Sequence, residues 1–195
     1  VIAVGPGLSV NSDIVEITAG IIRMAEVPLV LDADALNALS RDMSALRNLK
    51  SPAVLTPHPG EMARLLGISI EEVQDNRIET AEELSRRWNV ITVLKGSRTV
   101  VALPDGYKFI NPVGKPGMAT GGSGDVLTGV IAGLIAQGVR PSDAAAAGVY
   151  IHGSAGDMAA LDKGEHGMTA GDIADKLPYV IKELAEKRCL YGIQA

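Results

Sequence analysis

Short apolar runs that alternate with helical patterns constrain the fold of this chain more than any other feature. Four such runs are bounded by glycine, proline or acidic residues, and they are residues 1–4, 28–36, 52–60 and 90–96. Short apolar runs with these boundaries are typical of buried strands. Strands that alternate with helices favour a mostly parallel sheet with helices on both faces. The sequence therefore predicts an α/β fold.

Helical spacing fills most of the remaining chain. Residues 11–26 have apolar side chains at helical intervals, with Asn11 or Ser12 as the cap. A short helical stretch follows the second strand, and we predict longer helices over residues 69–88, 124–137, 142–161 and 169–188. Pro178 predicts a kink or a break in the last helix, because proline cannot donate the helical hydrogen bond.

One segment differs from the strand–helix alternation. Residues 99–111, "TVVALPDGYKFIN", contain two β-rich runs around Asp105 and Gly106. An Asp-Gly pair between two such runs is typical of a β-hairpin. We therefore expect antiparallel pairing at one edge of the sheet.

Length and charge exclude several classes of protein. The chain has 195 residues and a net charge of -5, so we expect one domain that does not bind nucleic acid. No apolar run approaches the roughly 20 residues of a membrane span. Cys189 is the one cysteine, which excludes an internal disulfide and fits a reducing compartment, so we predict a cytoplasmic protein. Because Val1 already lies in a strand-like run, we predict that residues 1–195 form an incomplete domain.

Polar residues gather where the predicted strands end. In parallel sheets, ligands lie outside the carboxyl ends of the strands. Residues 5–7, Asp32, Asp34, residues 56–61 and residues 95–96 all occupy such positions. We expect these residues to line a common site.

A glycine-rich segment, "GKPGMATGGSGDVLTG", spans residues 114–129. It matches neither the Walker A pattern nor Gly-x-Gly-x-x-Gly. Gly121, Gly122 and Gly124 permit unusual backbone angles and close approach to a ligand, and their N–H groups would converge at the start of a helix. The segment therefore predicts an anion site.

Asp125 stands beside this predicted anion site. A carboxylate next to phosphate is unfavourable unless it has a chemical role, and that role would be to accept a proton from an attacking hydroxyl. The alternative is a glycine-rich turn followed by an ordinary acid in the first turn of a helix.

Four separated motifs resemble one family of enzymes. They are "LDADALNAL", "LTPHPGEMARLLG", "GMATGGSGDVLTGVIAGLIAQG" and "HGMTAGDI", in that order along the chain. Together they resemble the ADP/ATP-dependent NAD(P)H-hydrate dehydratases of the ribokinase-like superfamily. The resemblance implies a ribokinase-like fold with the hairpin near the nucleotide site. It also implies phosphorylation of the 6-hydroxyl of hydrated NADH or NADPH by ADP or ATP with Mg²⁺, followed by loss of phosphate.

The resemblance assigns roles to individual residues. Asp125 would be the catalytic base. The anion hole and nucleotide site would be formed by Lys95, Gly96, Ser97, Arg98, Thr99, Lys115, Pro116, Gly117, Met118, Ala119, Thr120, Gly121, Gly122, Ser123 and Gly124. The hydrated substrate would contact Gly7, His58, Pro59, Gly60, Glu61, Arg64 and Asp125. We assign no residues of the chain to a metal.

Each of these segments also has a purely structural interpretation. Lys95 could be an exposed lysine at a strand end, and His58 a structural histidine between two prolines. Glu61 could be a first-turn acid that favours the helix dipole. Gly5 and Gly7 could form a tight turn.

The remaining polar residues carry weaker signals. Asp32 and Asp34 could assist a metal or water network, although Asp34 could equally cap a helix. His152 is predicted to be a packed helix residue, and His166 has no assigned role. No cysteine–histidine cluster has zinc spacing.

Members of this family have further strand and helix units before the segment that matches "VIAVGPG". Two alternative functions stay open: a ribokinase-like kinase of a small alcohol, and a nucleotide-binding module without catalysis. The motifs "TPHPGEMARL" and "GMTAGD" favour the dehydratase. The expected partners are small molecules and, as a homo-oligomer, other copies of the chain.

Overall fold

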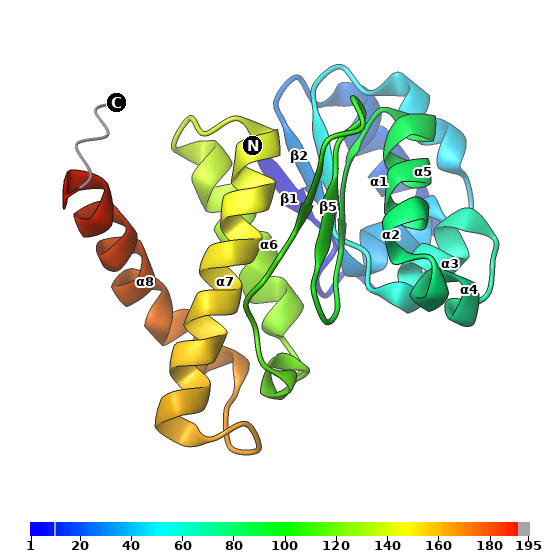
Figure 1. Ribbon diagram of the computed structural model, residues 1–195. Helices are drawn as coiled ribbons and strands as arrows, with labels where there is room; N and C mark the ends of the chain where they lie inside the picture. Colours follow the sequence, from blue (N-terminus) through cyan, green and yellow to red (C-terminus); the bar gives the residue numbers. More distant parts are fainter. Residues whose placement is uncertain (10, 191–195) are drawn as a thin grey trace.

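A computed structural model of the chain describes residues 1–9 and 11–190, with side chains up to residue 186. The described part has three layers, with a sheet between two sets of helices (Figure 1). This arrangement confirms the predicted α/β class with helices on both faces of the sheet.

Six strands form the sheet in the order β1-β2-β3-β4-β5-β6. Their bounds are Ile2–Val4, Leu29–Leu31, Ala53–Leu55, Ile91–Leu94, Val100–Ala102 and Lys108–Ile110. The first four strands are mutually parallel, whereas β5 runs antiparallel to β4 and β6 runs antiparallel to β5. The mostly parallel sheet and the edge hairpin are therefore confirmed.

One face of the sheet is covered by the helices from the first half of the chain. They are α1 (Ser12–Met24), α2 (Ala33–Leu39), the 3₁₀ helix η1 (Met43–Asn48), α3 (Pro59–Leu66), α4 (Ile70–Asp75) and α5 (Arg77–Trp88). Leu29 and Leu31 pack into this layer, whereas Val30 between them packs into the opposite one. Because both faces of β2 are buried, the strand is apolar at every position.

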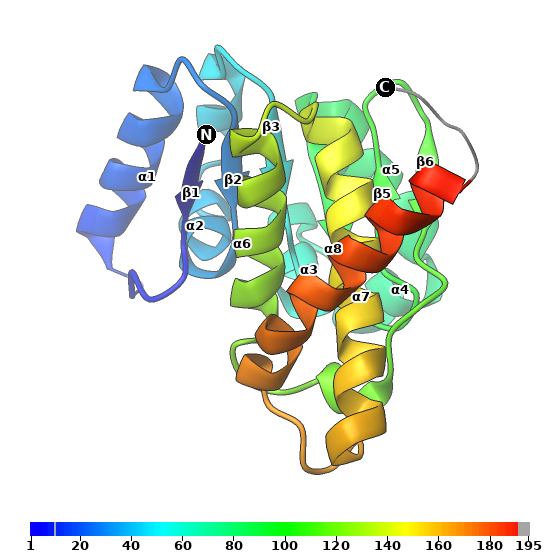
Figure 2. The ribbon, with the colours of Figure 1, turned by 90° about the vertical axis from the view of Figure 1, so that its left-hand side faces the viewer.

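The opposite face carries the helices from the second half of the chain. They are η2 (Pro116–Met118), α6 (Ser123–Ala136), α7 (Pro141–Lys163) and α8 (Ala170–Leu190). α6 and α7 pack on the sheet through Ile131 and Val149, and α8 packs on the outer side of these two helices (Figure 2).

Two helix predictions were wrong in detail. The single helix expected over residues 69–88 is divided at Asn76, whose non-helical φ of -129° and ψ of 47° end α4. The Asn76 carbonyl then accepts hydrogen bonds from the amide and hydroxyl of Thr80, which start α5. The Asn76 side chain also donates a hydrogen bond of 3.1 Å to the Glu72 carbonyl, and such a local bond competes with helix propagation.

At Pro178 we predicted a kink or a break; the break was wrong, because α8 continues through the proline, and the kink stays a prediction. Ile173 and Val180 lie on either side of the proline and are buried against Ala155 and Ala159 of α7. This packing offsets the hydrogen bond that proline removes from the helix.

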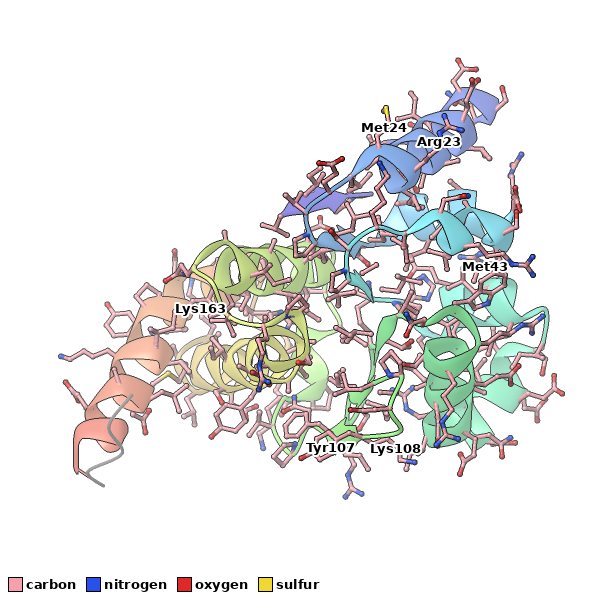
Figure 3. The ribbon with its side chains drawn as sticks, turned by 90° about the horizontal axis from the view of Figure 1, so that it is seen from above. Arg23, Met24, Met43, Tyr107, Lys108 and Lys163 are labelled. Atoms are coloured by element: carbon pink, nitrogen blue, oxygen red, sulfur yellow. The ribbon has the colours of Figure 1, made fainter. Side chains whose placement is uncertain are left out.

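Exposed apolar side chains mark both edges of the sheet. Met24, at the end of α1 beside β1, is 66% exposed, and Tyr107, in the hairpin turn, is 67% exposed. Figure 3 shows the two side chains on opposite sides of the molecule. Among the described helices, none is long and apolar enough to cross a membrane.

Candidate active site

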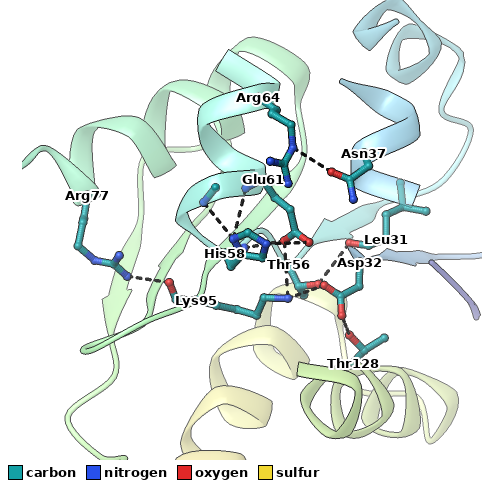
Figure 4. A network of polar contacts seen from close by, with 11 residues as sticks. Leu31, Asp32, Asn37, Thr56, His58, Glu61, Arg64, Arg77, Lys95 and Thr128 are labelled. Carbon is teal, nitrogen blue, oxygen red and sulfur yellow. Dashed lines mark hydrogen bonds and ion pairs between the residues drawn. The ribbon is translucent and has the colours of Figure 1, made fainter. Parts of the chain in front are cut away.

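The predicted site residues converge at the carboxyl ends of β2, β3 and β4. Asp32 follows β2, Thr56 follows β3 and Lys95 follows β4, so the parallel strand order brings them to one sheet edge. The first turn of α6 lies against the same edge, and Thr128 of that helix contacts Asp32 (Figure 4). The site therefore combines three strand ends with one helix start.

The glycine-rich loop leads directly into α6. Gly122 is the N-cap residue, has a φ of +86° and supplies no side chain to cap the helix. A Cβ at this position would lie 3.2 Å from the Cβ of Ala170, at the start of α8. The N–H groups of an uncapped first turn are available to an anion, and the helix dipole favours negative charge there.

Asp125 lies in this first turn and is exposed. Within the described part of the chain, its carboxylate has no hydrogen-bond or ion-pair partner. It lines a groove of about 580 Å³ together with Thr128 and Gly5, where β1 and α1 approach α6. An unpartnered carboxylate beside free helix N–H groups has the arrangement that a general base for phosphoryl transfer requires.

Asp32 is the centre of a buried polar network. Lys95 Nζ lies 2.6 Å from Asp32 Oδ1, and Thr128 Oγ1 donates a hydrogen bond of 2.8 Å to Asp32 Oδ2. Lys95 Nζ also lies 3.8 Å from Glu61 Oε2. The Asp32 and Glu61 side chains are 1% and 5% exposed, so both carboxylates depend on these partners rather than on water.

His58 and Glu61 form a reciprocal helix cap. His58 Nδ1 accepts hydrogen bonds from the Gly60 and Glu61 amides at 2.9 and 3.4 Å, and Glu61 Oε2 accepts one from the His58 amide at 2.7 Å. Because Nδ1 is an acceptor, the neutral ring carries its proton on Nε2, which lies 3.4 Å from Glu61 Oε1. The His58 side chain is 50% exposed, so this N–H can also reach a ligand.

The segment over residues 95–99 divides into two parts. Lys95 turns toward Asp32, whereas Ser97 and Arg98 are exposed. Arg77 holds the segment from the α5 side, with Nη2 donating to the carbonyls of Leu94 and Lys95 at 3.1 and 3.2 Å. The nucleotide-binding role of the segment stays a prediction.

Residues 115–120 form the approach to the glycine loop. Lys115 is exposed and precedes η2, which lies against residues 165–168 of the loop between α7 and α8. His166 in that loop is exposed, in keeping with its unassigned role. This packing brings the "HGMTAGDI" motif next to the glycine-rich loop, although the two are distant in sequence.

Arg64 and Asp34 lie at the margin of the site. Arg64 Nε donates to Asn37 Oδ1 at 3.0 Å on the exposed side of α3. Asp34 does not cap α2, because the N-cap position belongs to Asp32. Asp34 Oδ2 instead accepts a hydrogen bond of 2.8 Å from the Ser9 amide, so it anchors the loop after β1.

His152 is packed in α7, as expected, but it also contacts the anion loop. Its Nε2 lies 3.4 Å from Ser123 Oγ, at the first residue of α6. Burial lowers the pKa of His152 to about 4, the contact with Ser123 opposes this shift, and the charge of Lys95 adds to it. The ring is therefore neutral at pH 7.

Sequence reasoning missed three residues of this site. From the sequence, Thr128 is interpreted as an ordinary helix residue, Arg77 as a surface residue at a helix start, and His152 as a core residue. The one signal within reach was helical spacing, because Thr128 lies three positions after Asp125 and so shares its helix face.

Comparison with known proteins identifies the family. A family model described as NAD(P)H-hydrate dehydratase matches residues 1–179. The chain belongs to this family. A bifunctional NAD(P)H-hydrate repair enzyme from Moorella thermoacetica is 54% identical over 187 residues, which are 96% of this chain and 35% of that protein.

Two solved structures confirm the ribokinase-like fold of this family member. An ADP/ATP-dependent NAD(P)H-hydrate dehydratase from Bacillus subtilis, co-crystallised with ATP and Mg²⁺, is 36% identical with a TM-score of 0.84. A ribokinase-like superfamily protein from Enterococcus faecalis is 32% identical with a TM-score of 0.76. Each match covers 93% of this chain and 63% of the other chain, so this chain spans less than two thirds of either.

Proposed function

We propose that this chain carries out the ADP- or ATP-dependent dehydration of hydrated NADH or NADPH, a repair reaction that restores the dinucleotide. The observation that carries the proposal is Asp125, an unpartnered carboxylate in the first turn of an uncapped helix behind a glycine-rich loop. Membership of the dehydratase family supports the choice of substrate.

The first step transfers a phosphoryl group to the substrate. The backbone N–H groups around Gly122 and Gly124 hold the terminal phosphate of the nucleotide and stabilise the charge on its oxygens. Asp125 accepts the proton of the 6-hydroxyl as its oxygen bonds to phosphorus. The bond from phosphorus to the bridging oxygen breaks, which leaves AMP from ADP, or ADP from ATP.

The second step eliminates the phosphate. The lone pair of the ring nitrogen expels the phosphate from carbon 6, and the adjacent ring carbon then loses a proton to restore the double bond. The electron-rich ring supplies most of the driving force. The chain therefore needs to orient the ring and to keep water away from the cationic ring carbon until the proton is lost, because water would add to that carbon again.

We propose that Mg²⁺ enters with the nucleotide. Within the described residues, no three acidic, histidine or cysteine side chains gather to hold a metal. In phosphoryl transfer Mg²⁺ is usually bound mainly through nucleotide phosphates and water, with few protein ligands, and we propose that mode here. When bound, the ion would share the phosphate charge with the loop N–H groups.

We place the hydrated ring on the side of His58 and Glu61, because they lie at the end of β3 on the sheet edge that α6 faces. The Nε2–H of His58 would donate to the substrate, and Gly7 and Arg64 would lie farther out. A homo-oligomeric state and a cytoplasmic location remain predictions.

The test is incubation of the chain with hydrated NADH and either ADP or ATP, followed by absorbance at the NADH band. Asp125→Asn keeps the shape of the side chain but removes the base, so turnover should fall by about 10² to 10⁴ with nucleotide binding retained. The matched control is Asp143→Asn, an exposed first-turn acid on α7, which should behave as wild type.

Other outcomes would assign a different function. Near-normal turnover by Asp125→Asn would remove this residue from the mechanism. Phosphorylation of small alcohols in place of hydrated NADH would identify a kinase. Nucleotide binding without turnover of either substrate would identify a binding module.

A further inference from the structure

Lys95 lies in the segment that sequence predicts to bind the nucleotide, yet its ammonium group points elsewhere. Nζ lies 2.6 Å from Asp32 Oδ1 and 3.8 Å from Glu61 Oε2, and the Lys95 side chain is 19% exposed. Two buried carboxylates therefore already compensate its charge. A cation held in this way has little attraction left for a nucleotide phosphate.

The partner of Lys95 is also bound to the catalytic helix. Asp32 Oδ2 accepts a hydrogen bond from the hydroxyl of Thr128, which lies one turn after Asp125 on α6. With Lys95 on Oδ1 and Thr128 on Oδ2, both oxygens of this buried carboxylate are satisfied. Removal of Lys95 leaves the buried charge of Asp32 without a compensating cation, which is strongly unfavourable, whereas removal of the Thr128 hydroxyl costs one hydrogen bond.

Gly124 brings the loop itself onto this pair. A Cβ at Gly124 would lie 3.3 Å from Lys95 Nζ and 3.9 Å from Asp32 Oδ2. The ammonium group of Lys95 therefore lies in close contact with Gly124, the last glycine of the anion loop. The start of α6 contacts the Lys95–Asp32 ion pair at Gly124 and is hydrogen-bonded to Asp32 through Thr128. Asp125 lies between these two residues in the helix.

From this geometry we infer that Lys95 is a positioning residue and not a nucleotide ligand. Together with Asp32 it fixes the first turn of α6, so that Asp125 and the loop N–H groups keep the spacing that phosphoryl transfer requires. The inference deepens the proposed function and rests on it for its effect on turnover.

The nucleotide charge must then be met by other cations of the predicted segments. Arg98 and Lys115 are both exposed, and neither side chain has a hydrogen-bond or ion-pair partner within the described part of the chain. Arg98 lies three residues after Lys95 in the same loop, which makes it the matched comparison. The inference assigns to Arg98 the charge contact that the motif suggested for Lys95.

The experiment compares Lys95→Met, Asp32→Asn, their double variant and Arg98→Met. In Lys95→Met, kcat should fall about 10- to 100-fold, because small displacements of a catalytic group are costly, while the Kd for ADP or ATP stays within about twofold. In the double variant part of the lost turnover should return, because Asp32 no longer carries a buried charge without its cation, while Glu61 keeps its hydrogen bond from the His58 amide. Arg98→Met should instead weaken nucleotide binding about tenfold with kcat retained.

Hydrogen exchange supplies a readout that does not depend on turnover. Amides of residues 122–128 should exchange faster in Lys95→Met than in wild type, and no faster in Arg98→Met. If Lys95→Met does not fold, Thr128→Val removes only the hydroxyl that binds Asp32, and should lower kcat about three- to tenfold at unchanged nucleotide Kd.

Three results would overturn the inference. A large rise in nucleotide Kd in Lys95→Met, without coupling to Asp32→Asn, would make Lys95 a ligand. Loss of thermal stability with unchanged kcat and exchange would make the pair structural only. Unchanged exchange over residues 122–128 would show that the pair does not hold α6. If wild type does not act on hydrated NADH, the proposed function fails, while nucleotide Kd and exchange still decide the role of Lys95.

Discussion

His58 has two separable functions in this structure, and two substitutions can divide them. Nδ1 caps α3 by accepting hydrogen bonds from the Gly60 and Glu61 amides, while the half-exposed side chain carries its Nε2–H on the proposed substrate side. His58→Ala removes both functions. His58→Asn keeps a side chain that ranks among the best helix caps and removes the Nε2–H.

The expected magnitudes follow from these contacts. Loss of an N-cap side chain costs about 1 kcal/mol of stability, so only His58→Ala should lower the free energy of unfolding by that amount. Loss of one hydrogen bond to the substrate costs about 1–3 kcal/mol, so both variants should raise the KM for hydrated NADH about tenfold to a hundredfold. The KM for the nucleotide should stay nearly unchanged in both.

The assay is urea unfolding for stability, together with both KM values from the NADH absorbance assay on the same preparations. A wild-type KM for hydrated NADH in His58→Asn would refute a substrate contact and leave His58 as a helix cap alone. A change in the nucleotide KM instead would mean that donor and acceptor sites have been exchanged.

Two further predictions concern the anion loop and the histidine behind it. Gly122→Val should weaken nucleotide binding and turnover together by at least about tenfold, because its φ of +86° disfavours a branched side chain. The control is Gly133→Val, where a Cβ meets nothing within 4 Å, and this variant should bind nucleotide normally. Equal nucleotide affinity in both variants would place the phosphates elsewhere. The pKa of His152 falls from 6.5 to about 4 on folding, so the unfolded chain binds the extra proton and stability should be lost as pH falls from 6.5 toward 4, by up to about 3 kcal/mol. His152→Gln should flatten this part of the stability curve measured by urea unfolding, and an unchanged slope would show that other groups cause the acid sensitivity.

Much of the fold could be predicted because it depends on local patterns. Apolar runs without alternation indicated strands buried on both faces, and their alternation with helices indicated a parallel sheet. Helix starts followed from side chains that bind nearby amides, as Asn11 does for α1. The Asp105-Gly106 pair likewise marked the hairpin, since turn geometry is set by the residues within the turn.

Local patterns were misleading where distant packing or a competing local bond decided the outcome. The helical spacing over residues 69–88 did not show that Asn76 would end one helix and start another. The proline in α8 predicted a kink or a break, but burial of Ile173 and Val180 against α7 maintained the helix without a break. In each case the competing contact was absent from the pattern that made the prediction.

The sequence by itself determined which residues could do chemistry: the glycine loop, Asp125 and the polar residues at the strand ends. Only the tertiary structure decided how they are paired. Asp32 meets Lys95 across 63 positions and Thr128 across 96, because strand order places β2 beside β3 and β4 beyond it, and because α6 returns to the same sheet edge. Periodicity encodes which face of an element is buried, but it carries no signal for which buried charge lies opposite. That depends on strand order and register, which the whole chain sets together.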